Sequence, residues 1–155
     1  MDYKKINEAL SYDHLTGLLV RKTGRNKGKV AGYNDKNGYI ELHLFRKRVK
    51  AHRVAWLLFY GSWPKFQIDH INGITHDNRI INLRDVPHSI NQQNRRNPQK
   101  NNKIKCLGVY KSRDRFIATI QIRNKKIYLG SFESIEEAQL SYIKTKRKLH
   151  HGCMI

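Results

Sequence analysis

The sequence is poor in cysteine, in acidic residues and in long apolar runs. Its two cysteines, Cys106 and Cys153, are far apart and form no Cys-x-x-Cys pair. A structural zinc knuckle needs such pairs and a disulfide framework needs more cysteines, so neither is expected. Both thiols are predicted to be reduced, as in a cytosol.

The apolar runs are short and Pro occurs only three times. A membrane-spanning helix needs roughly 18 consecutive apolar residues, and no run approaches that length. No cationic start followed by an apolar stretch marks a secretory signal. We therefore predict a cytoplasmic protein that is neither secreted nor inserted in a membrane.

Acidic residues are outnumbered. The 155 residues include 31 Lys and Arg against 12 Asp and Glu, a formal net charge of +19. Such a charge predicts a polyanionic partner. The basic residues are interleaved with Tyr, Phe and Trp, whereas disordered basic tails have few aromatics. The composition indicates a folded protein that binds nucleic acid.

The first zone, residues 1–64, is predicted to be rich in β-structure. A short helix is expected at 4–10 and a longer one at 52–60, stopped by Gly61 and Pro64. The strands between these helices are expected at 17–21, 29–31, 39–45 and 48–51.

The second zone reads as strand, loop, strand and helix. Strands are expected at 67–70 and 83–86, separated by a polar loop at 71–79. Pro87 suits the first turn of a helix that continues to about Arg96.

This middle zone carries the residues best suited to phosphodiester hydrolysis, which needs an activated water and a cation. His70 is suited to take a proton near neutral pH. A carboxylate such as Asp69 and an amide oxygen such as that of Asn91 are hard ligands for Mg²⁺. Neighbouring strand residues project to opposite sides, so Asp69 and His70 can divide the two tasks.

Asp69-His70, Asn82 and Asn91 resemble the ββα-metal motif of HNH nucleases, in the variant that ends in Asn rather than His. The wider pattern resembles HNH homing endonucleases of phages and introns over roughly the first two-thirds of the chain. It comprises Tyr12-Asp-His-x-Thr-Gly, Ala51-His-Arg-Val-Ala-Trp, Tyr60-Gly-x-Trp-Pro, Ile68-Asp-His-Ile-Asn-Gly and Asp77-Asn-Arg-Ile-x-Asn-Leu-Arg.

The resemblance implies a role for each residue. His70 matches the general base, and Asp69 and Asn91 match the two protein ligands of a single divalent cation. Asn82 matches the central Asn, which ties the backbone of the metal loop and so orients His70. Mg²⁺ or Mn²⁺ is expected; Asn at the last position argues against zinc. No small-molecule cofactor is implied.

Each candidate also has a purely structural interpretation. Asp69 would be a turn cap, His70 a surface histidine and Asn91 an exposed helical amide. His52 is expected to pack or to form a hydrogen bond. Further basic side chains are candidate phosphate contacts whose alternative is a solvated, electrostatic role: Arg79, Arg84, His88 and Arg95.

Residues 98–104 are predicted to be a polar linker, followed by a third zone at 105–155. Strands are expected at 107–111, 115–122 and 125–132. Ser134 then has the position of a helix N-cap, with Glu137 completing a capping box. The inner face of that helix is expected at Ala138, Tyr142, Thr145 and Leu149.

The strings Leu107-Gly-Val-Tyr, Tyr128-Leu-Gly-Ser-Phe and Ser134-x-Glu-Glu-Ala resemble the Apetala2 or ethylene-response-factor DNA-binding domain, over about 105–152. That resemblance implies a three-stranded antiparallel sheet backed by one helix, with the sheet in the major groove. Tyr110 and Phe116 depart from the plant pattern, which commonly has Arg and Trp there. Plant-type base specificity is therefore not carried over.

Alternation along 115–123 places Phe116, Ala118, Ile120 and Ile122 toward the helix. Base readout is considered for Arg115 and Arg123, with phosphate contact the commoner outcome. The candidate DNA-binding residues of this zone are Tyr110, Lys111, Arg113, Arg115, Thr119, Gln121, Arg123, Lys125 and Lys126.

Together these observations predict an α+β chain with a nuclease domain at 1–97 (ββα-metal core about 66–97), a linker at 98–104 and a DNA-binding domain at 105–155. Its predicted substrate is duplex DNA, in the host cell cytoplasm if a phage encodes it. A non-catalytic DNA-binding regulator is the alternative; an RNA-binding protein is a third possibility with less motif support. The oligomeric state is left open, with a monomer favoured.

Overall fold

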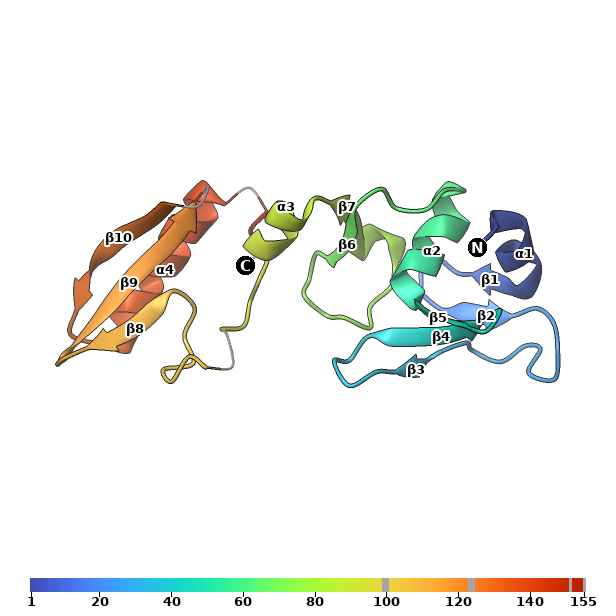
Figure 1. The fold of residues 1–155 in the computed structure, drawn as a ribbon, viewed down its shortest axis with the longest axis horizontal. Helices are drawn as coiled ribbons and strands as arrows, with labels where there is room; N and C mark the ends of the chain where they lie inside the picture. The colour runs from blue at the N-terminus through green and yellow to red at the C-terminus, as the bar shows by residue number, and fades with distance from the viewer. Residues whose placement is uncertain (99–100, 123–124, 151, 155) are drawn as a thin grey trace. The chain divides into compact units, whose positions relative to one another are not determined.

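The computed structural model describes residues 1–98, 101–122, 125–150 and 152–154. They form two compact units, Met1–His88 and Ser89–Ile155, which are described separately. The fold is mixed α and β, with small antiparallel sheets and four α-helices in the described residues, so the predicted α+β class is confirmed (Figure 1). The domain boundaries expected at 97 and 105 stay a prediction.

The first part of unit Met1–His88 is a helix followed by two small sheets. Strand β1 pairs with β2, and β3, β4 and β5 form a three-stranded sheet in that order. The elements are α1 (Tyr3–Ala9), β1 (Leu10–Tyr12), β2 (Leu19–Arg21), β3 (Tyr33–Asn34), β4 (Ile40–Leu44), β5 (Lys47–Lys50) and α2 (Ala51–Tyr60).

Helix α2 joins two hydrophobic cores. Val54 and Leu57 belong to one core with Ile6 of α1 and Leu42 of β4. Ala55 belongs to the other, with residues of the next hairpin. The helix ends at Gly61, which adopts a left-handed φ of 75° and donates its N–H to Leu57 at 2.8 Å. This is the stop that the sequence predicted.

The second hairpin holds β6 (Gln67–His70) and β7 (Leu83–Val86), paired antiparallel with the predicted bounds. Ile68 and Leu83 pack against Ala55, which fixes the hairpin on α2. A 3₁₀ turn, η1 (Ile80–Asn82), leads into β7, and α3 (His88–Gln93) follows it.

Three local expectations for these elements differ from the structure. The strand expected at 29–31 is reduced to an isolated bridge between Val30 and Val20. Helix α3 ends before Arg96, because the N–H groups of Asn94 and Arg95 bond three residues back, to Asn91 and Gln92. Such bonds tighten the last turn and end a helix. Strands β1 and β3 were not expected; they span three and two residues, too few for an alternating pattern.

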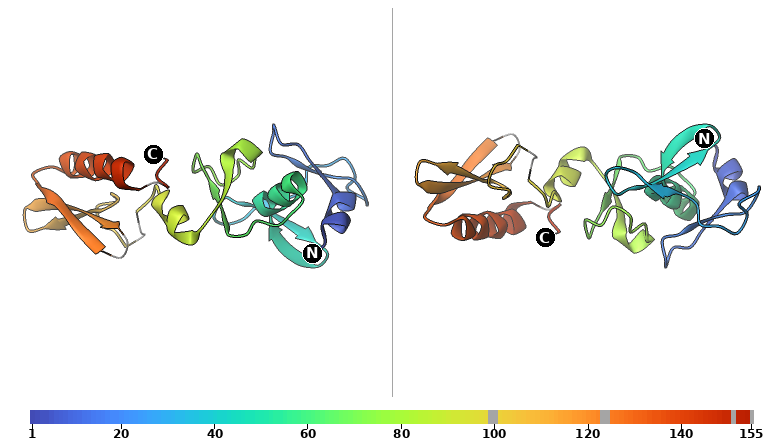
Figure 2. Two further views of the ribbon diagram at one scale, coloured as in Figure 1. Left: turned by 90° about the horizontal axis from the view of Figure 1, so that it is seen from above. Right: turned by 90° about the horizontal axis from the view of Figure 1, so that it is seen from below.

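Unit Ser89–Ile155 contains a three-stranded antiparallel sheet in the order β10-β9-β8, with one helix on its face (Figure 2). Its elements are β8 (Val109–Ser112), β9 (Arg115–Ile122), β10 (Lys125–Phe132) and α4 (Ile135–Leu149). The Ser134 hydroxyl accepts the N–H of Glu137 at 3.1 Å, so the predicted cap is confirmed. Arg123 and Asn124, expected at the β9–β10 turn, lie outside the described residues.

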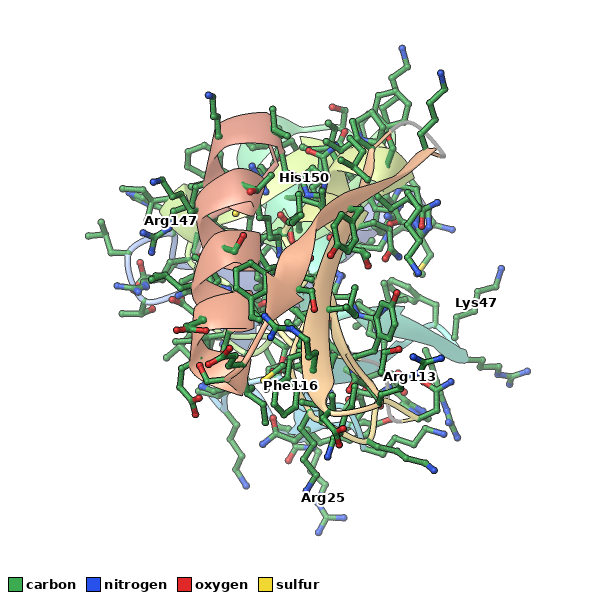
Figure 3. All side chains as sticks on the ribbon, turned by 90° about the vertical axis from the view of Figure 1, so that its left-hand side faces the viewer. Arg25, Lys47, Arg113, Phe116, Arg147 and His150 are labelled. Carbon is green, nitrogen blue, oxygen red and sulfur yellow. The ribbon has the colours of Figure 1, made fainter. Side chains whose placement is uncertain are left out.

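Helix α4 lies against one face of the sheet, where Val109, Ala118 and Ala138 form the core with Phe116 packed against them (Figure 3). Gly108 allows the close approach: it adopts a φ of 69°, and a Cβ there would meet the ring of Tyr142.

The inner face of α4 differs from the prediction in its last turn. Leu149 is exposed, whereas Lys146 is 1% exposed. The Lys146 ammonium donates to the backbone oxygen of Arg95 at 2.5 Å and lies 5.9 Å from the centroid of the Tyr142 ring. The apolar spacing predicted Leu149 for the inner face of this turn. Lys146 is buried there instead, because a backbone oxygen accepts the hydrogen bond of its ammonium group.

Burial of Lys146 predicts a measurable pH dependence of stability. Burial lowers the pKa of Lys146 in the folded chain, so between that pKa and about 10.4 the unfolded chain binds more protons. Stability contributed at this site therefore rises as pH rises through that window. We expect the thermal unfolding midpoint of Lys146→Met to rise less between pH 8 and 10.5 than that of wild type. The matched variant Lys144→Met changes an exposed lysine of the same helix and should keep the wild-type slope; equal slopes for both variants would contradict the prediction.

No helix in the described ranges combines the length and apolar character needed to cross a membrane.

Candidate active site

The end of β6 places two functional candidates side by side in the chain and buries both. Asp69 is 7% exposed and His70 is 4% exposed. The hairpin register sets Asp69 opposite Arg84 and His70 opposite Leu83. The alternative interpretation of His70 as a surface histidine is therefore wrong.

The His70 imidazole is oriented by the loop that follows β6. Its Nε2 lies 3.2 Å from Oδ1 of Asn78, a residue that is 4% exposed. A carbonyl oxygen only accepts, so Nε2 carries the hydrogen and Nδ1 carries the lone pair. Burial lowers the pKa of His70, while the bond to Asn78 acts in the opposite direction. Near neutral pH the ring is therefore neutral, which is the form that a general base requires.

Two further rings surround His70. The centroid of the His52 ring lies 5.1 Å from that of His70, at an interplanar angle of 89°. The Tyr39 ring is 5.8 Å from His70 and 5.6 Å from His52. The hydrogen bond to Asn78 and the contacts with these two rings all act on the position of the His70 ring.

Asn82 bridges the two ends of the loop between β6 and η1. Its Oδ1 accepts the N–H of Asn72 at 2.9 Å, and its Nδ2 donates to the backbone oxygen of Asp77 at 2.8 Å. The Asn82 backbone oxygen also accepts the N–H of Ile71 at 2.9 Å. A buried amide that binds backbone at both ends of a loop restricts the loop's conformation.

Asp77 organises the same loop from its side chain. Its carboxylate accepts two bonds from the Arg79 guanidinium, at 2.8 and 2.7 Å, and one from Asn72 Nδ2 at 2.7 Å. Hydrogen bonding from Arg79 is the main cause that lowers the pKa of Asp77 to about 2. Arg79, a predicted phosphate contact, therefore forms an ion pair inside the loop while half of its side chain stays exposed.

Asp69 is paired across the hairpin. Its Oδ2 accepts from Nε and Nη2 of Arg84, at 2.8 and 2.6 Å. Arg84, a predicted phosphate contact, thus places its positive charge on the carboxylate proposed to bind a cation. The donor type fits, because hard cations prefer carboxylate oxygens.

Within the described part of the chain, no three His, Cys, Asp or Glu side chains are grouped to hold a metal ion. The predicted set of one carboxylate, Asp69, and one carboxamide, Asn91, is smaller. Mg²⁺ commonly binds through one or two protein oxygens and keeps waters or substrate oxygens as its other ligands.

The remaining predicted residues of this zone lie around α3. Asn91 is half-buried on α3, in unit Ser89–Ile155, whereas Asp69 belongs to unit Met1–His88. A metal site shared by the two residues therefore stays a prediction. His88 is exposed, with its Nδ1 3.1 Å from Oε1 of Gln67. Arg95 is exposed and donates from Nε to the backbone oxygen of Asn97 at 3.0 Å.

Asn78 and Tyr39 are the residues that the sequence did not single out. Asn78 lies inside the string 77–84, but no spacing rule distinguishes its amide from its neighbours. The aromatic contact of Tyr39 with His70 joins positions 31 residues apart, and only the tertiary fold brings them together.

The exposed face of the C-terminal sheet carries most of the other predicted residues. The register sets Tyr110 opposite Ile117, Thr119 opposite Tyr128, and Gln121 opposite Lys126. The Lys126 ammonium lies 4.9 Å from the centroid of the Tyr110 ring. Tyr128, which the sequence did not single out, is 62% exposed.

Lys111, Lys125 and Arg113 have other positions, whereas Arg115 lies on the exposed face and contacts its neighbours there. Lys111 is opposite Phe116 and Lys125 is opposite Ile122. Directly opposite residues lie on the same face of a sheet, so both lysines are on the face toward α4. Arg115 donates to the Ser131 hydroxyl at 2.9 Å and pairs with a Glu133 carboxylate oxygen at 3.3 Å. Arg113 occupies the β8–β9 turn with a left-handed φ of 52° (Figure 3).

Residues 49–93 match a family model described as HNH endonuclease. No curated protein and no solved structure matches the chain. The matched residues include α2, the β6–β7 hairpin and α3, and with them Asp69, His70, Asn82 and Asn91. Over residues 49–93 the chain is therefore similar to HNH endonucleases.

Proposed function

We propose that this protein is a DNA endonuclease that hydrolyses phosphodiester bonds with one divalent cation, Mg²⁺ or Mn²⁺, and with His70 as the general base. One observation carries the proposal. Within the matched HNH segment, His70 is a buried, neutral imidazole whose Nε2 is bonded to Asn78. A neutral imidazole is the form that can accept a proton from water.

The chemical roles follow from the contacts. His70 takes a proton from the attacking water, and Oδ1 of Asn78 stabilises the imidazolium that results. Asn82 and Asp77 keep the loop that carries Asn78 in place. Asp69 and Asn91 would hold the cation, which when bound supplies positive charge for the phosphate oxygens and the leaving oxygen.

The proposal includes DNA binding by the exposed face of the C-terminal sheet. A twisted sheet fits the major groove, and this face combines Lys126 with two exposed aromatic rings, Tyr110 and Tyr128. In this proposal residues 105–155 form an Apetala2-like domain and the enzyme is of the phage homing type. Its substrate is duplex DNA, in the host cell cytoplasm if a phage encodes it; the oligomeric state is left open, with a monomer favoured.

Lys126 offers a direct test of that face. We expect Lys126→Ala to weaken duplex binding about equally for unrelated sequences, because a phosphate contact carries no base information. The slope of log affinity against log salt should fall in magnitude by about 1. Fluorescence anisotropy from low to moderate salt measures both quantities. Lys148→Ala removes an exposed charge from α4 and should leave the slope unchanged; an equal loss in both variants would mean that only net charge matters.

A cleavage assay tests the activity. The full chain is incubated with supercoiled duplex DNA and Mg²⁺ or Mn²⁺, with and without a chelator. Strand breaks that the chelator suppresses are the expected result. Salt-dependent binding without breaks under any divalent cation would instead favour the non-catalytic regulator. Preferential binding of RNA over duplex DNA in competition would favour an RNA-binding protein.

A further inference from the structure

Three aromatic rings meet at the proposed base. Tyr39, His52 and His70 contact one another pairwise, with centroid separations between 5.1 and 5.8 Å. We call Tyr39 and His52 the ring pair. Their planes are strongly inclined to that of His70, by 56° for Tyr39 and 89° for His52, so the pair limits rotation of the His70 ring.

The ring pair is itself anchored. The Tyr39 N–H donates to Oδ1 of Asp35 at 3.0 Å, and Oδ2 of Asp35 accepts from the Lys50 ammonium at 2.5 Å. Lys50 also pairs with Glu41 at 2.7 Å. Tyr39 lies outside the matched residues 49–93, so a segment preceding the HNH match reaches the proposed base.

His52 contributes packing without a charge. It lies in the first turn of α2 and is 8% exposed, and no hydrogen-bond partner of its Nδ1 occurs among the described residues. Burial, followed by the positive charge of His70, lowers the pKa of His52 to about 3. The His52 ring is therefore neutral near neutral pH.

Orientation matters for His70 because only one ring orientation keeps Nε2 on Asn78. The torsion between Cβ and an imidazole ring is broad and roughly two-fold, so the side chain alone selects no orientation. Rotation of the ring would break the bond to Asn78 and move Nδ1. Neighbouring rings that pack against the His70 ring restrict its rotation and so favour one orientation.

We propose that Tyr39 and His52 are positioning residues that hold the His70 ring in the orientation that keeps Nε2 on Asn78. This inference rests on the proposed role of His70 as the base. It extends the active site to the connection between β3 and β4, which contains Tyr39.

The test compares variants that remove a ring with variants that keep one. Tyr39→Leu and His52→Ala are each expected to lower kcat about 10- to 100-fold, the scale of a small misplacement of a reacting group, with KM for DNA unchanged. Tyr39→Phe and His52→Phe should recover most of the lost kcat, because they restore a ring. Phe45→Leu changes an exposed residue next to β4 and serves as the unaffected control.

A second readout does not depend on activity. ¹⁵N NMR of the histidine side chains reports which ring nitrogen carries hydrogen. We expect a single Nε2–H form for His70 in wild type and in the two Phe variants, and a mixture of the two tautomers in Tyr39→Leu and His52→Ala. A residue that served stability alone would change the unfolding midpoint but not the tautomer of the folded protein.

The possible outcomes separate this inference from the proposed function. Wild-type cleavage by His70→Ala would overturn the role of His70 as base and, with it, this inference. An inactive His70→Ala together with wild-type kcat and a single tautomer in Tyr39→Leu and His52→Ala would overturn the positioning role alone. So would Phe variants as impaired as their ring-free counterparts. If His52→Ala does not fold, Tyr39→Leu, at a half-buried position, decides.

Discussion

His70→Ala is expected to cut duplex DNA about 10²- to 10⁴-fold more slowly than wild type, which is the range for loss of a general acid or base. Alanine cannot accept the proton of the attacking water. The substitution also removes the hydrogen bond between the imidazole and Asn78. DNA affinity should remain, because binding depends on the distributed positive charge of +19. Single-turnover cleavage with saturating enzyme measures the chemical step, and anisotropy with a chelator present measures binding.

A histidine in the loop that follows β6 provides the control for this variant. His76 is exposed, and His76→Ala should cut at the wild-type rate. A stability measurement is also needed, because His70 is buried against His52 and Tyr39 and its truncation leaves a space. If folded His70→Ala cuts like wild type, another group must activate the water.

Local patterns predicted the elements whose signals lie within a few residues. Strands β6 and β7 have the expected bounds: the polar loop 71–79 follows β6, and Pro87 directly follows β7. The start of α4 was predicted because the Ser134 cap and Glu137 belong to one turn. The sequence could not place Lys146 in the interior, because its acceptor is a backbone oxygen 51 residues away.

The same limit applies to the candidate site. Asp69 and His70 were predicted from the chemistry of their side chains, and Asn82 from the resemblance to HNH nucleases. Asn78 was not, because its bond to His70 depends on how the loop after β6 folds back. The ion pair of Asp69 with Arg84 depends on the hairpin register, which neither strand specifies alone.

That ion pair makes Asp69 the second position with a large expected effect. Asp69→Asn keeps the side-chain shape but removes the charge that Arg84 faces at 2.6 Å. Removing one partner of a buried pair costs about 3 kcal/mol or more. Because 21% of the Arg84 side chain remains exposed, we expect about 2 to 3 kcal/mol of unfolding free energy to be lost. Cleavage should fall as well, because an amide binds a divalent cation less strongly than a carboxylate.

A double variant separates the two effects of Asp69→Asn. In Asp69→Asn/Arg84→Gln the guanidinium is also removed. No buried positive charge is then left without a carboxylate partner, so most of the lost unfolding free energy should return. Cation binding, measured by calorimetry with Mn²⁺, and cleavage should both stay low. Glu8→Gln changes an exposed acid in α1 and controls for the loss of one negative charge. Restoration of stability and of cleavage together in the double variant would mean that Asp69 acts only as the partner of Arg84, and the cation would then need other ligands.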